Sequence, residues 1–202
     1  MREWGTNVKE SAKPLYLILG ESGSGKDAIV RRVCEMLRVR QVVSYTTRPR
    51  RKGEVNGREH YFISDGAFRR KFPDMIAKTT FDGYRYGATI GEVNGRRRWD
   101  APADLYVIDP AGAKHMNRAR MNRPIFEVYI SVPETTRMYR MFCRGEERGT
   151  VERRIQHDRK AFAAYRESGS PDYVIENNGI METPVLELAQ IIMKNWPQEA
   201  GK

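Results

Sequence analysis

The sequence predicts an α/β fold with a parallel sheet flanked by helices, a small inserted β-rich lobe and a helical lid. Short apolar runs of strand length alternate along the chain with longer stretches that repeat apolar residues at helical spacing. Such alternation is typical of a parallel sheet covered on both faces. A glycine-rich segment follows the first apolar run, and a chain of 202 residues can bury a core.

The first strand, loop and helix carry the most informative motif. Residues 15–20, LYLILG, form an apolar run that ends at glycine and predicts a buried strand. Residues 26–37 repeat apolar side chains at helical spacing. Between them, GESGSGKD matches the phosphate-loop pattern G-x-x-x-x-G-K-[ST] at every fixed position except the last, where Asp27 replaces the hydroxyl residue.

A phosphate loop binds through its backbone. Consecutive N–H groups and the N-terminus of the following helix can surround phosphate oxygens, and Lys26 would reach the β- and γ-phosphates. A tight glycine turn that binds nothing is the alternative, but the strand before it and the helix after it favour a phosphate loop. We therefore expect these residues to bind ATP: Gly20, Ser22, Gly23, Ser24, Gly25, Lys26 and Asp27.

Two acids lie in or beside this loop. Asp27 stands where a Ser or Thr hydroxyl normally ligates Mg²⁺, and because Mg²⁺ prefers hard oxygen ligands, a carboxylate could replace the hydroxyl. A carboxylate in the first helical turn also suits the helix dipole, so Asp27 could instead only cap the helix or bind the metal through water. We expect Glu21 to point away from the phosphates.

The character of the sequence changes over residues 44–95. Several glycines, many aromatic residues and short alternating runs such as HYFIS and YRYGATI predict a small, mostly β lobe. One short helix is expected near Phe68. The lobe is therefore an insertion between two parts of the α/β core.

The core pattern resumes after the lobe. Residues 104–112 predict a strand that Pro110 ends, followed by a helix to about residue 121. Residues 125–132 predict the next strand, and Pro133 opens a helix to about residue 142.

The last part of the chain begins with a charged segment. Residues 144–154, RGEERGTVERR, are punctuated by glycine and predict a mobile loop. A helix over residues 153–167, a short strand over 172–177 and a terminal amphipathic helix over 184–196 complete the pattern. We expect one domain: core residues 14–43, 104–139 and 160–197, lobe 44–95, lid 140–159, and a leader or disordered segment 1–13.

Composition limits the classes of partner. The formal net charge is +10, with basic clusters at residues 48–52, 96–98 and 140–159. Scattered clusters suit several phosphate contacts around a cleft better than one DNA-binding stripe, so we expect no nucleic-acid partner. The sequence has neither an apolar run of membrane-spanning length nor a recognisable signal peptide, which predicts a cytoplasmic protein without membrane contact. The two cysteines and three histidines lack metal-binding spacing, and nothing indicates an oligomeric state.

One longer segment indicates a family. Residues 44–64, SYTTRPRRKGEVNGREHYFIS, resemble the segment that binds the nucleoside monophosphate in guanylate kinases. With the phosphate loop upstream, the pattern from about residue 15 to residue 196 is similar to that family. The resemblance implies a P-loop NTPase-type core, a nucleoside-monophosphate-binding lobe, a lid, and Mg²⁺-dependent transfer of a phosphoryl group from ATP.

The resemblance also implies which residues bind the acceptor. Arg48 and Arg51 match two arginines that clamp the monophosphate, a task for which the planar guanidinium is suited. His60 falls at a phosphate-binding tyrosine, and a slip of one residue would put Tyr61 there instead. Tyr61 and Tyr86 could equally be core residues. The implied set that binds the acceptor is Ser44, Arg48, Arg51, His60, Tyr61, Tyr86 and Asp109.

Three positions depart from the family pattern where the acceptor base is read. Ala77 replaces an acid that accepts hydrogen bonds from guanine, Ala88 replaces a serine, and Val107 replaces the second of two acids that include Asp109. Asp74 lies near enough in sequence that a local shift could bring it to the position of Ala77. The resemblance therefore implies GMP or dGMP as acceptor, while these substitutions leave room for another base.

The lid segment retains its arginines. The resemblance implies that Lys26, Arg144, Arg148 and Arg154 are catalytic and that Asn177 contacts the adenine of ATP. A solvated charged helix is the alternative for some of the arginines. The chain is thus interpreted as an ATP-dependent nucleoside monophosphate kinase; the alternative is a guanylate kinase-like module that binds ligands or proteins without catalysis. Such modules usually lose the loop lysine and lid arginines, which this chain keeps.

Overall fold

The computed structural model describes residues 13–51, 53–95, 101–119, 121–168 and 171–196. Its central sheet has five parallel strands in the order β2-β7-β1-β8-β9, which confirms the predicted α/β class. The phosphate loop follows the middle strand. The strands are β1 (Leu15–Leu19), β2 (Arg40–Gln41), β7 (Asp104–Val107), β8 (Ile125–Ser131) and β9 (Tyr173–Glu176).

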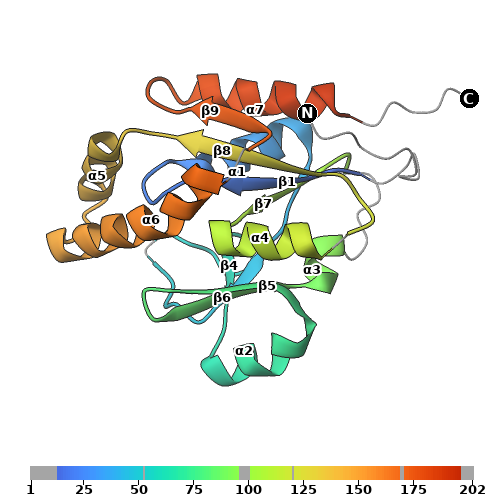
Figure 1. Cartoon of the computed structure of the whole chain (residues 1–202), viewed down its shortest axis with the longest axis horizontal. Coiled ribbons are helices and arrows are strands. Elements are labelled where there is room, and N and C mark those ends of the chain that lie inside the picture. Colours follow the sequence, from blue (N-terminus) through green and yellow to red (C-terminus); the bar gives the residue numbers. More distant parts are fainter. Residues whose placement is uncertain (1–12, 52, 96–100, 120, 169–170, 197–202) are drawn as a thin grey trace, which may run out of the picture.

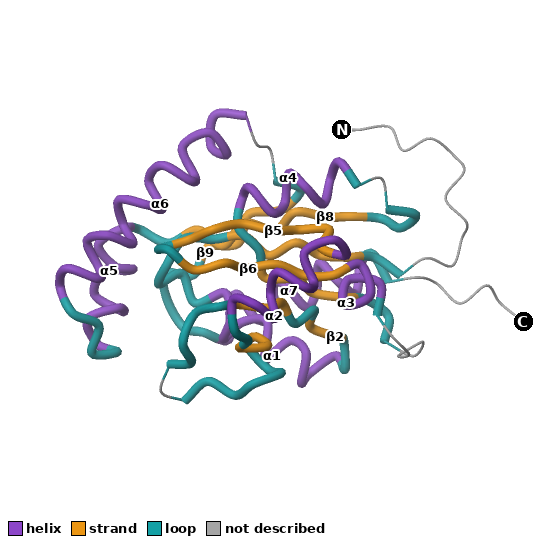
Figure 2. The backbone as a smooth tube through the Cα atoms, turned by 90° about the horizontal axis from the view of Figure 1, so that it is seen from below, coloured by secondary structure: helices purple, strands orange, loops and turns teal. Residues whose placement is uncertain are grey.

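Helices cover both faces of this sheet. Helices α1 (Lys26–Leu37) and α7 (Glu182–Lys194) pack on one face, and α4 (Pro110–Arg118) and α6 (Arg148–Ser168) on the other, as Figure 1 shows. Helix α5 (Glu134–Cys143) lies beside the first half of α6 at one end of the molecule, in both Figure 1 and Figure 2. None of the helices in the described part of the chain has both the length and the apolar composition of a membrane span.

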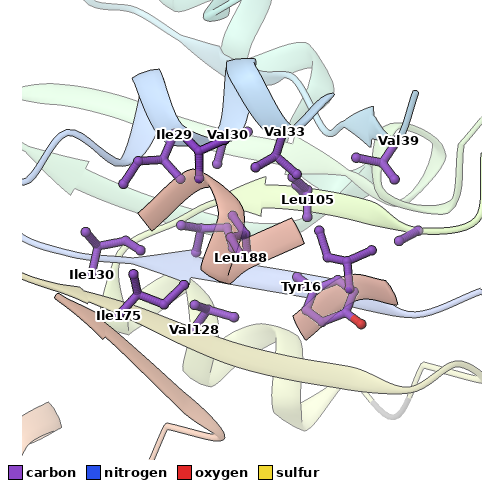
Figure 3. Close-up of a cluster of buried hydrophobic side chains, with 14 of the residues drawn as sticks. Tyr16, Ile29, Val30, Val33, Val39, Leu105, Val128, Ile130, Ile175 and Leu188 are labelled. Carbon is purple, nitrogen blue, oxygen red and sulfur yellow. The ribbon is translucent and has the colours of Figure 1, made fainter. Parts of the chain in front are cut away.

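The alternation of side chains along β1 divides the core in two. Tyr16 and Ile18 point to the face of α1 and α7, where they meet Leu188 and other apolar side chains (Figure 3). The neighbouring residues of β1 point to the opposite face and pack against α4, α6 and the lobe, through Met116 and Phe162 among others. Burial of both faces explains why the strand is an uninterrupted apolar run in the sequence.

The inserted lobe has its own sheet, in the order β4-β3-β6-β5. A small apolar cluster of Tyr45, Phe68 and Met75 holds its short helix α2 against the sheet. The 3-10 turn η1 and helix α3 were not predicted. The lobe elements are β3 (Ser44–Thr46), β4 (His60–Phe62), α2 (Asp65–Lys71), η1 (Phe72–Asp74), β5 (Met75–Phe81), β6 (Tyr84–Thr89) and α3 (Ile90–Asn94).

The structure corrects the mobile loop predicted over residues 144–154. Helix α6 begins at Arg148 and runs without a break to Ser168. Val151 and Ile155 lie buried against Met141 of α5, so one apolar side chain within the charged segment and one directly after it fix the first turns of α6 by packing. The predicted leader, except for Lys13, and the basic cluster of residues 96–98 lie outside the described residues.

A buried carboxylate joins the edge of the main sheet to the lobe. Asp104, at the start of β7, is fully buried and lies 2.7 Å from Arg40 Nε, 2.8 Å from Arg123 Nη2 and 3.3 Å from Lys13 Nζ. Arg40 also donates to two backbone carbonyls of α3. Burial alone would raise the pKa of the Asp104 carboxyl, but Arg40 and Arg123 together outweigh it and hold that pKa below its ordinary value.

We predict that Asp104→Asn lowers the free energy of unfolding by about 3 to 5 kcal/mol at pH 7, because it leaves buried cations without their counter-charge. Urea denaturation measures this difference. The depressed pKa stabilises the fold above the ordinary pKa of aspartate, and this contribution is lost as the pH falls through the folded-state value. The difference between the two proteins therefore shrinks in acid.

The matched control is Glu35→Gln, which removes an exposed carboxylate from α1 and should leave stability within about 0.5 kcal/mol. A loss below about 1 kcal/mol for Asp104→Asn would contradict the importance of the cluster, because a buried pair that is broken on one side costs more than that.

Candidate active site

An open cleft lies where the phosphate loop, the lobe, the end of β7 and helix α6 meet. Because the carboxyl ends of parallel strands share one edge of the sheet, the loop after β1 and the residues after β7 reach the same place. The structure brings these predicted site residues into the cleft lining: Gly20, Ser22, Lys26, Asp27, Ser44, Arg48, Arg51, His60, Tyr86, Asp109 and Arg154. The other predicted residues lie outside the lining: Gly23, Ser24, Gly25, Tyr61, Arg144, Arg148 and Asn177.

Neighbouring residues pack closely against the phosphate loop on the side away from the cleft. Gly23 and Gly25 have positive φ angles of 82° and 84°, which favour glycine. A Cβ atom would lie 2.6 Å from the Arg137 carbonyl oxygen at Gly23 and 2.7 Å from Asn177 Nδ2 at Gly25. Both glycines are therefore needed for the backbone path and for the approach of neighbouring elements.

Asn177 supports this loop from the side away from the cleft. Its buried Nδ2 donates to the Ser24 carbonyl at 2.8 Å, and its own backbone carbonyl accepts from Arg140 Nη2 at 2.8 Å. The adenine contact implied by the resemblance stays a prediction; the contacts present hold the loop in place.

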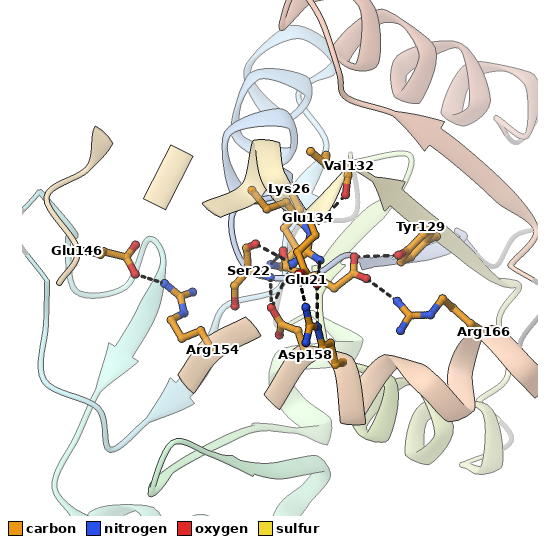
Figure 4. A network of polar contacts seen from close by, with 12 residues as sticks. Glu21, Ser22, Lys26, Tyr129, Val132, Glu134, Glu146, Arg154, Asp158 and Arg166 are labelled. Atoms are coloured by element: carbon orange, nitrogen blue, oxygen red, sulfur yellow. Dashed lines mark hydrogen bonds and ion pairs between the residues drawn. The ribbon is translucent and has the colours of Figure 1, made fainter. Parts of the chain in front are cut away.

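Glu21 points away from the cleft, as expected for a carboxylate inside an anion-binding loop. Its Oε2 accepts from the Tyr129 hydroxyl at 2.8 Å, and its Oε1 pairs with Arg166 Nη1 at 3.0 Å (Figure 4). Burial, assisted by Glu21, raises the pKa of Tyr129, so this hydroxyl stays protonated and donates. The contacts fix the first half of the loop to β8 and α6.

His60 and Tyr61 occupy opposite sides of β4. His60 lines the cleft, and its Nδ1 lies 2.8 Å from the Ser44 hydroxyl oxygen. Tyr61 stacks on Tyr45, with ring centroids 5.0 Å apart, and packs in the lobe core. The alternation of side chains along a strand therefore places His60 on the cleft side, without the one-residue slip considered for Tyr61.

Arg48 is held in position on the acceptor side. Its Nη1 and Nη2 donate to the two carboxylate oxygens of Glu54 at 3.0 and 2.7 Å. Its guanidinium also lies over the Phe62 ring, 5.5 Å from the centroid. Such a bidentate pair fixes the plane of the guanidinium that faces the cleft.

The three departures from the family pattern leave no carboxylate at the position of Ala77. Ala77 and Ala88 are paired across β5 and β6 and are 2% and 0% exposed. Asp74 is exposed and lies outside the cleft lining, so the local shift considered above is absent. Val107 lines the cleft, and Asp109 both lines it and caps α4 by accepting from the Gly112 N–H at 2.7 Å.

Of the lid arginines, the structure brings Arg154 into the cleft. Arg154 pairs with Glu146 at 2.6 Å. Arg144 is exposed and pairs with Glu146 at 2.9 Å, whereas Arg148 is exposed and pairs with Glu152 one turn along α6. Ion pairs at such exposed positions are weak, so Arg144 and Arg148 can release their partners at little cost.

Sequence reasoning missed two titratable cleft residues on the same helix. His157 packs edge-on against Phe81 of the lobe, with ring centroids 4.2 Å apart. Asp158 accepts from the Ser22 N–H of the phosphate loop at 2.8 Å. Their spacing of three and four residues after Arg154 places all three side chains on one face of a helix, a pattern that could have identified them once this segment was known to be helical.

The electrostatics keep His60 neutral. Burial is the largest cause that lowers its pKa below the ordinary value, and the positive charge of Arg48 adds to it. The Asp27 carboxylate acts in the opposite direction from across the cleft. At pH 7 the imidazole is therefore uncharged and shares a hydrogen bond with Ser44.

Known proteins provide an independent comparison. The family model for guanylate kinase matches residues 12–195. A guanylate kinase from Thermobifida fusca (strain YX) is 33% identical over 182 residues, which span 86% of this chain and 88% of that protein. A guanylate kinase from Syntrophus aciditrophicus (strain SB) is 29% identical over 197 residues, 96% of this chain and 92% of that protein.

A solved structure agrees at the level of the fold. The crystal structure of guanylate kinase from Anaplasma phagocytophilum superimposes with a TM-score of 0.66 at 22% identity, covering 94% of this chain and 89% of that one.

We predict that the imidazole of His60 titrates with a pKa below about 6.5, the ordinary value for histidine. An NMR titration of the ring protons measures the midpoint, with a short histidine-containing peptide as reference and His60→Gln to assign the resonance. Arg48→Gln should raise the midpoint, but not to that of the peptide, because burial remains. A His60 midpoint at or above that of the peptide would contradict the described environment.

Proposed function

Because the chain belongs to the guanylate kinase family of ATP-dependent nucleoside monophosphate kinases, we propose that it transfers the γ-phosphoryl group of ATP to GMP or dGMP. The products are ADP and the nucleoside diphosphate. The observation that carries the proposal is one cleft that is lined by the phosphate loop, by the paired arginines of the lobe and by Arg154 of α6. This cleft offers cationic or N–H partners to the donor phosphates and to the acceptor phosphate. It also offers cations to the charge that develops between them during transfer.

On the donor side, the loop binds the phosphates of ATP. Its backbone N–H groups and the N-terminus of α1 supply hydrogen bonds and the positive end of the helix dipole. Lys26 lines the cleft, where its Nζ lies 3.5 Å from the Glu21 carbonyl oxygen. This contact is long, so the ammonium is free to turn to the β- and γ-phosphates.

On the acceptor side, Arg48 and Arg51 clamp the monophosphate, with Tyr86 and His60 beside them. Glu54 keeps the Arg48 guanidinium ordered before the acceptor binds, which reduces the entropy lost on binding. A neutral His60 offers a hydrogen bond to phosphate or to the base without adding charge.

Ala77 cannot accept hydrogen bonds from guanine as a carboxylate at this position would. Discrimination between guanine and other bases is therefore weaker. Loss of a charged acceptor costs about 1.5–3 kcal/mol, or roughly 10- to 150-fold in discrimination. We therefore propose that the preference for guanine is modest and that other bases are accepted at measurable rates.

Transfer of the phosphoryl group needs positioning and charge neutralisation more than covalent chemistry. Lys26 and Arg154 both line the cleft, one from the loop and one from α6, and stabilise the charge on the transferring group. The contact between Phe81 and His157 closes the lobe against α6 and helps to exclude water. The acceptor phosphate attacks in line, without a covalent enzyme intermediate.

The cleft also suits the Mg²⁺ that accompanies ATP. Asp27 and Asp109 present carboxylate oxygens on its lining, and these are the hard ligands that Mg²⁺ prefers. Mg²⁺ commonly takes its other ligands from phosphates and water, so a site of few protein ligands is adequate. When bound, the ion neutralises phosphate charge.

We predict turnover in a coupled assay of ADP release when the common nucleoside monophosphates and deoxynucleoside monophosphates are offered with ATP and Mg²⁺. GMP or dGMP should give the highest kcat/KM. The ratio of this kcat/KM to that of the next-best base should be smaller than it would be with a carboxylate at the position of Ala77. Turnover with none of the acceptors would refute the kinase assignment. Turnover restricted to guanine would refute the modest preference.

The control variant for this assay is Lys26→Met, which removes the cation of the phosphate loop. We expect kcat to fall at least ~100-fold, the loss typical of one catalytic electrostatic partner. Its melting temperature should stay unchanged, because Lys26 is not part of the apolar core. A Lys26→Met protein that retains turnover would show that the ATP phosphates bind elsewhere.

We predict that Asp27→Ser raises the Mg²⁺ concentration for half-maximal activity by about threefold to tenfold, because a neutral hydroxyl replaces a charged oxygen ligand. Initial rates at saturating ATP and acceptor over a range of Mg²⁺ measure this. The control, Asp74→Ser, removes an exposed acid outside the cleft and should change nothing. An unchanged metal dependence for Asp27→Ser would mean that Asp27 only begins the helix.

A further inference from the structure

Helix α6 places a buried carboxylate on the phosphate loop. Asp158 is 5% exposed, and its Oδ2 accepts a hydrogen bond from the Ser22 N–H at 2.8 Å. Figure 4 shows the Asp158 side chain directed at Ser22 from α6. Both residues line the cleft, so the contact lies where the donor phosphates are proposed to bind.

Arg137 makes this burial possible. The Arg137 side chain is 5% exposed, and its Nη1 lies 3.6 Å from Asp158 Oδ2. Arg137 also donates to the Val132 carbonyl at 3.2 Å and to the Ser22 carbonyl at 3.4 Å. A buried carboxylate is costly unless it is paired and hydrogen-bonded, and Asp158 has both a cation and an N–H donor. The Asp158 carboxylate can therefore remain buried and charged while it accepts from the Ser22 N–H.

The same N–H group cannot serve two anions. A phosphate loop binds its ligand through consecutive backbone N–H groups, and the Ser22 N–H already points to a carboxylate oxygen. A phosphate oxygen at this donor would also lie close to the Asp158 charge, and like charges at such distances repel. Binding of the donor phosphates therefore favours the departure of Asp158.

We propose that Asp158 is an internal competitor of ATP: its carboxylate occupies the Ser22 N–H in the nucleotide-free protein and is displaced when the phosphates bind. This inference rests on the proposed function, because it takes the loop to be the ATP site. The second contact between α6 and the loop, Arg166 with Glu21, faces away from the cleft and does not compete. It keeps the second half of α6 attached to the loop when Asp158 leaves.

Replacement of the carboxylate by an amide tests this. The amide has the same size and keeps one oxygen acceptor but carries no charge. Asp158→Asn should therefore bind a non-hydrolysable β,γ-imido analogue of ATP, with Mg²⁺, about threefold to tenfold more tightly than the unmodified protein. Isothermal titration calorimetry gives both dissociation constants. The KM of the acceptor should change by less than about twofold, a separation that general loss of structure would not produce.

The control is Glu167→Gln, which removes an exposed carboxylate from the same helix and should leave analogue binding unchanged. Equal tightening in this control would assign the effect to net charge and overturn the proposal. Unchanged or weaker analogue binding by folded Asp158→Asn would also overturn the proposal that Asp158 competes with ATP. In that case, analogue binding by the unmodified protein would still leave the proposed function intact. No analogue binding by the unmodified protein would overturn both.

A measurement on the unmodified protein covers the case in which the variant does not fold. The Ser22 amide resonance, assigned in a ¹H–¹⁵N spectrum, should move on addition of the analogue, because a phosphate oxygen replaces the carboxylate as acceptor. A Ser22 amide that keeps its chemical shift at saturating analogue would overturn displacement.

Discussion

The backbone path of the phosphate loop is the constraint on which the site depends. Gly23 and Gly25 adopt positive φ angles and leave no space for a Cβ atom, because α5 and Asn177 approach the loop directly from behind. Side chains from three elements then fix the loop: Asn177 after β9, Tyr129 of β8 and Arg166 of α6. The loop is therefore ordered before any nucleotide arrives, which favours tight binding.

The parallel arrangement of the strands places residues for a second substrate beside this ordered loop. The carboxyl ends of β1 and β7 meet at one edge, so Lys26 and Asp109 share a cleft although they are distant in sequence. The lobe adds Arg48 and α6 adds Arg154. Cations thus reach the cleft from the loop, the lobe and the helix, while a half-buried acid outside its lining, Glu54, holds Arg48 in place.

Two parts of the site could be predicted from short stretches of sequence. The glycine spacing predicted the loop, and the resemblance of residues 44–64 to guanylate kinases implied roles for Ser44 and Arg48, which the structure places in the cleft lining. The predicted start of α6 was wrong. The packing of Val151 and Ile155 outweighs the glycine and charge pattern from which a loop was predicted. The contact of Asp158 with Ser22 and the pairing of β4 with β3 are tertiary features, which no single segment of the sequence reveals.

The central claim is that one cleft receives both nucleotides, each on its own set of cations. Thermal denaturation with single ligands tests it most directly, because a ligand at about 100 times its Kd should raise the melting temperature by about 5 to 10 °C. At least one nucleoside monophosphate should stabilise the protein, and Arg48→Gln should abolish that shift while it keeps the shift caused by an ATP analogue. Failure of every monophosphate to stabilise the protein, or an unchanged monophosphate shift in Arg48→Gln, would contradict the account.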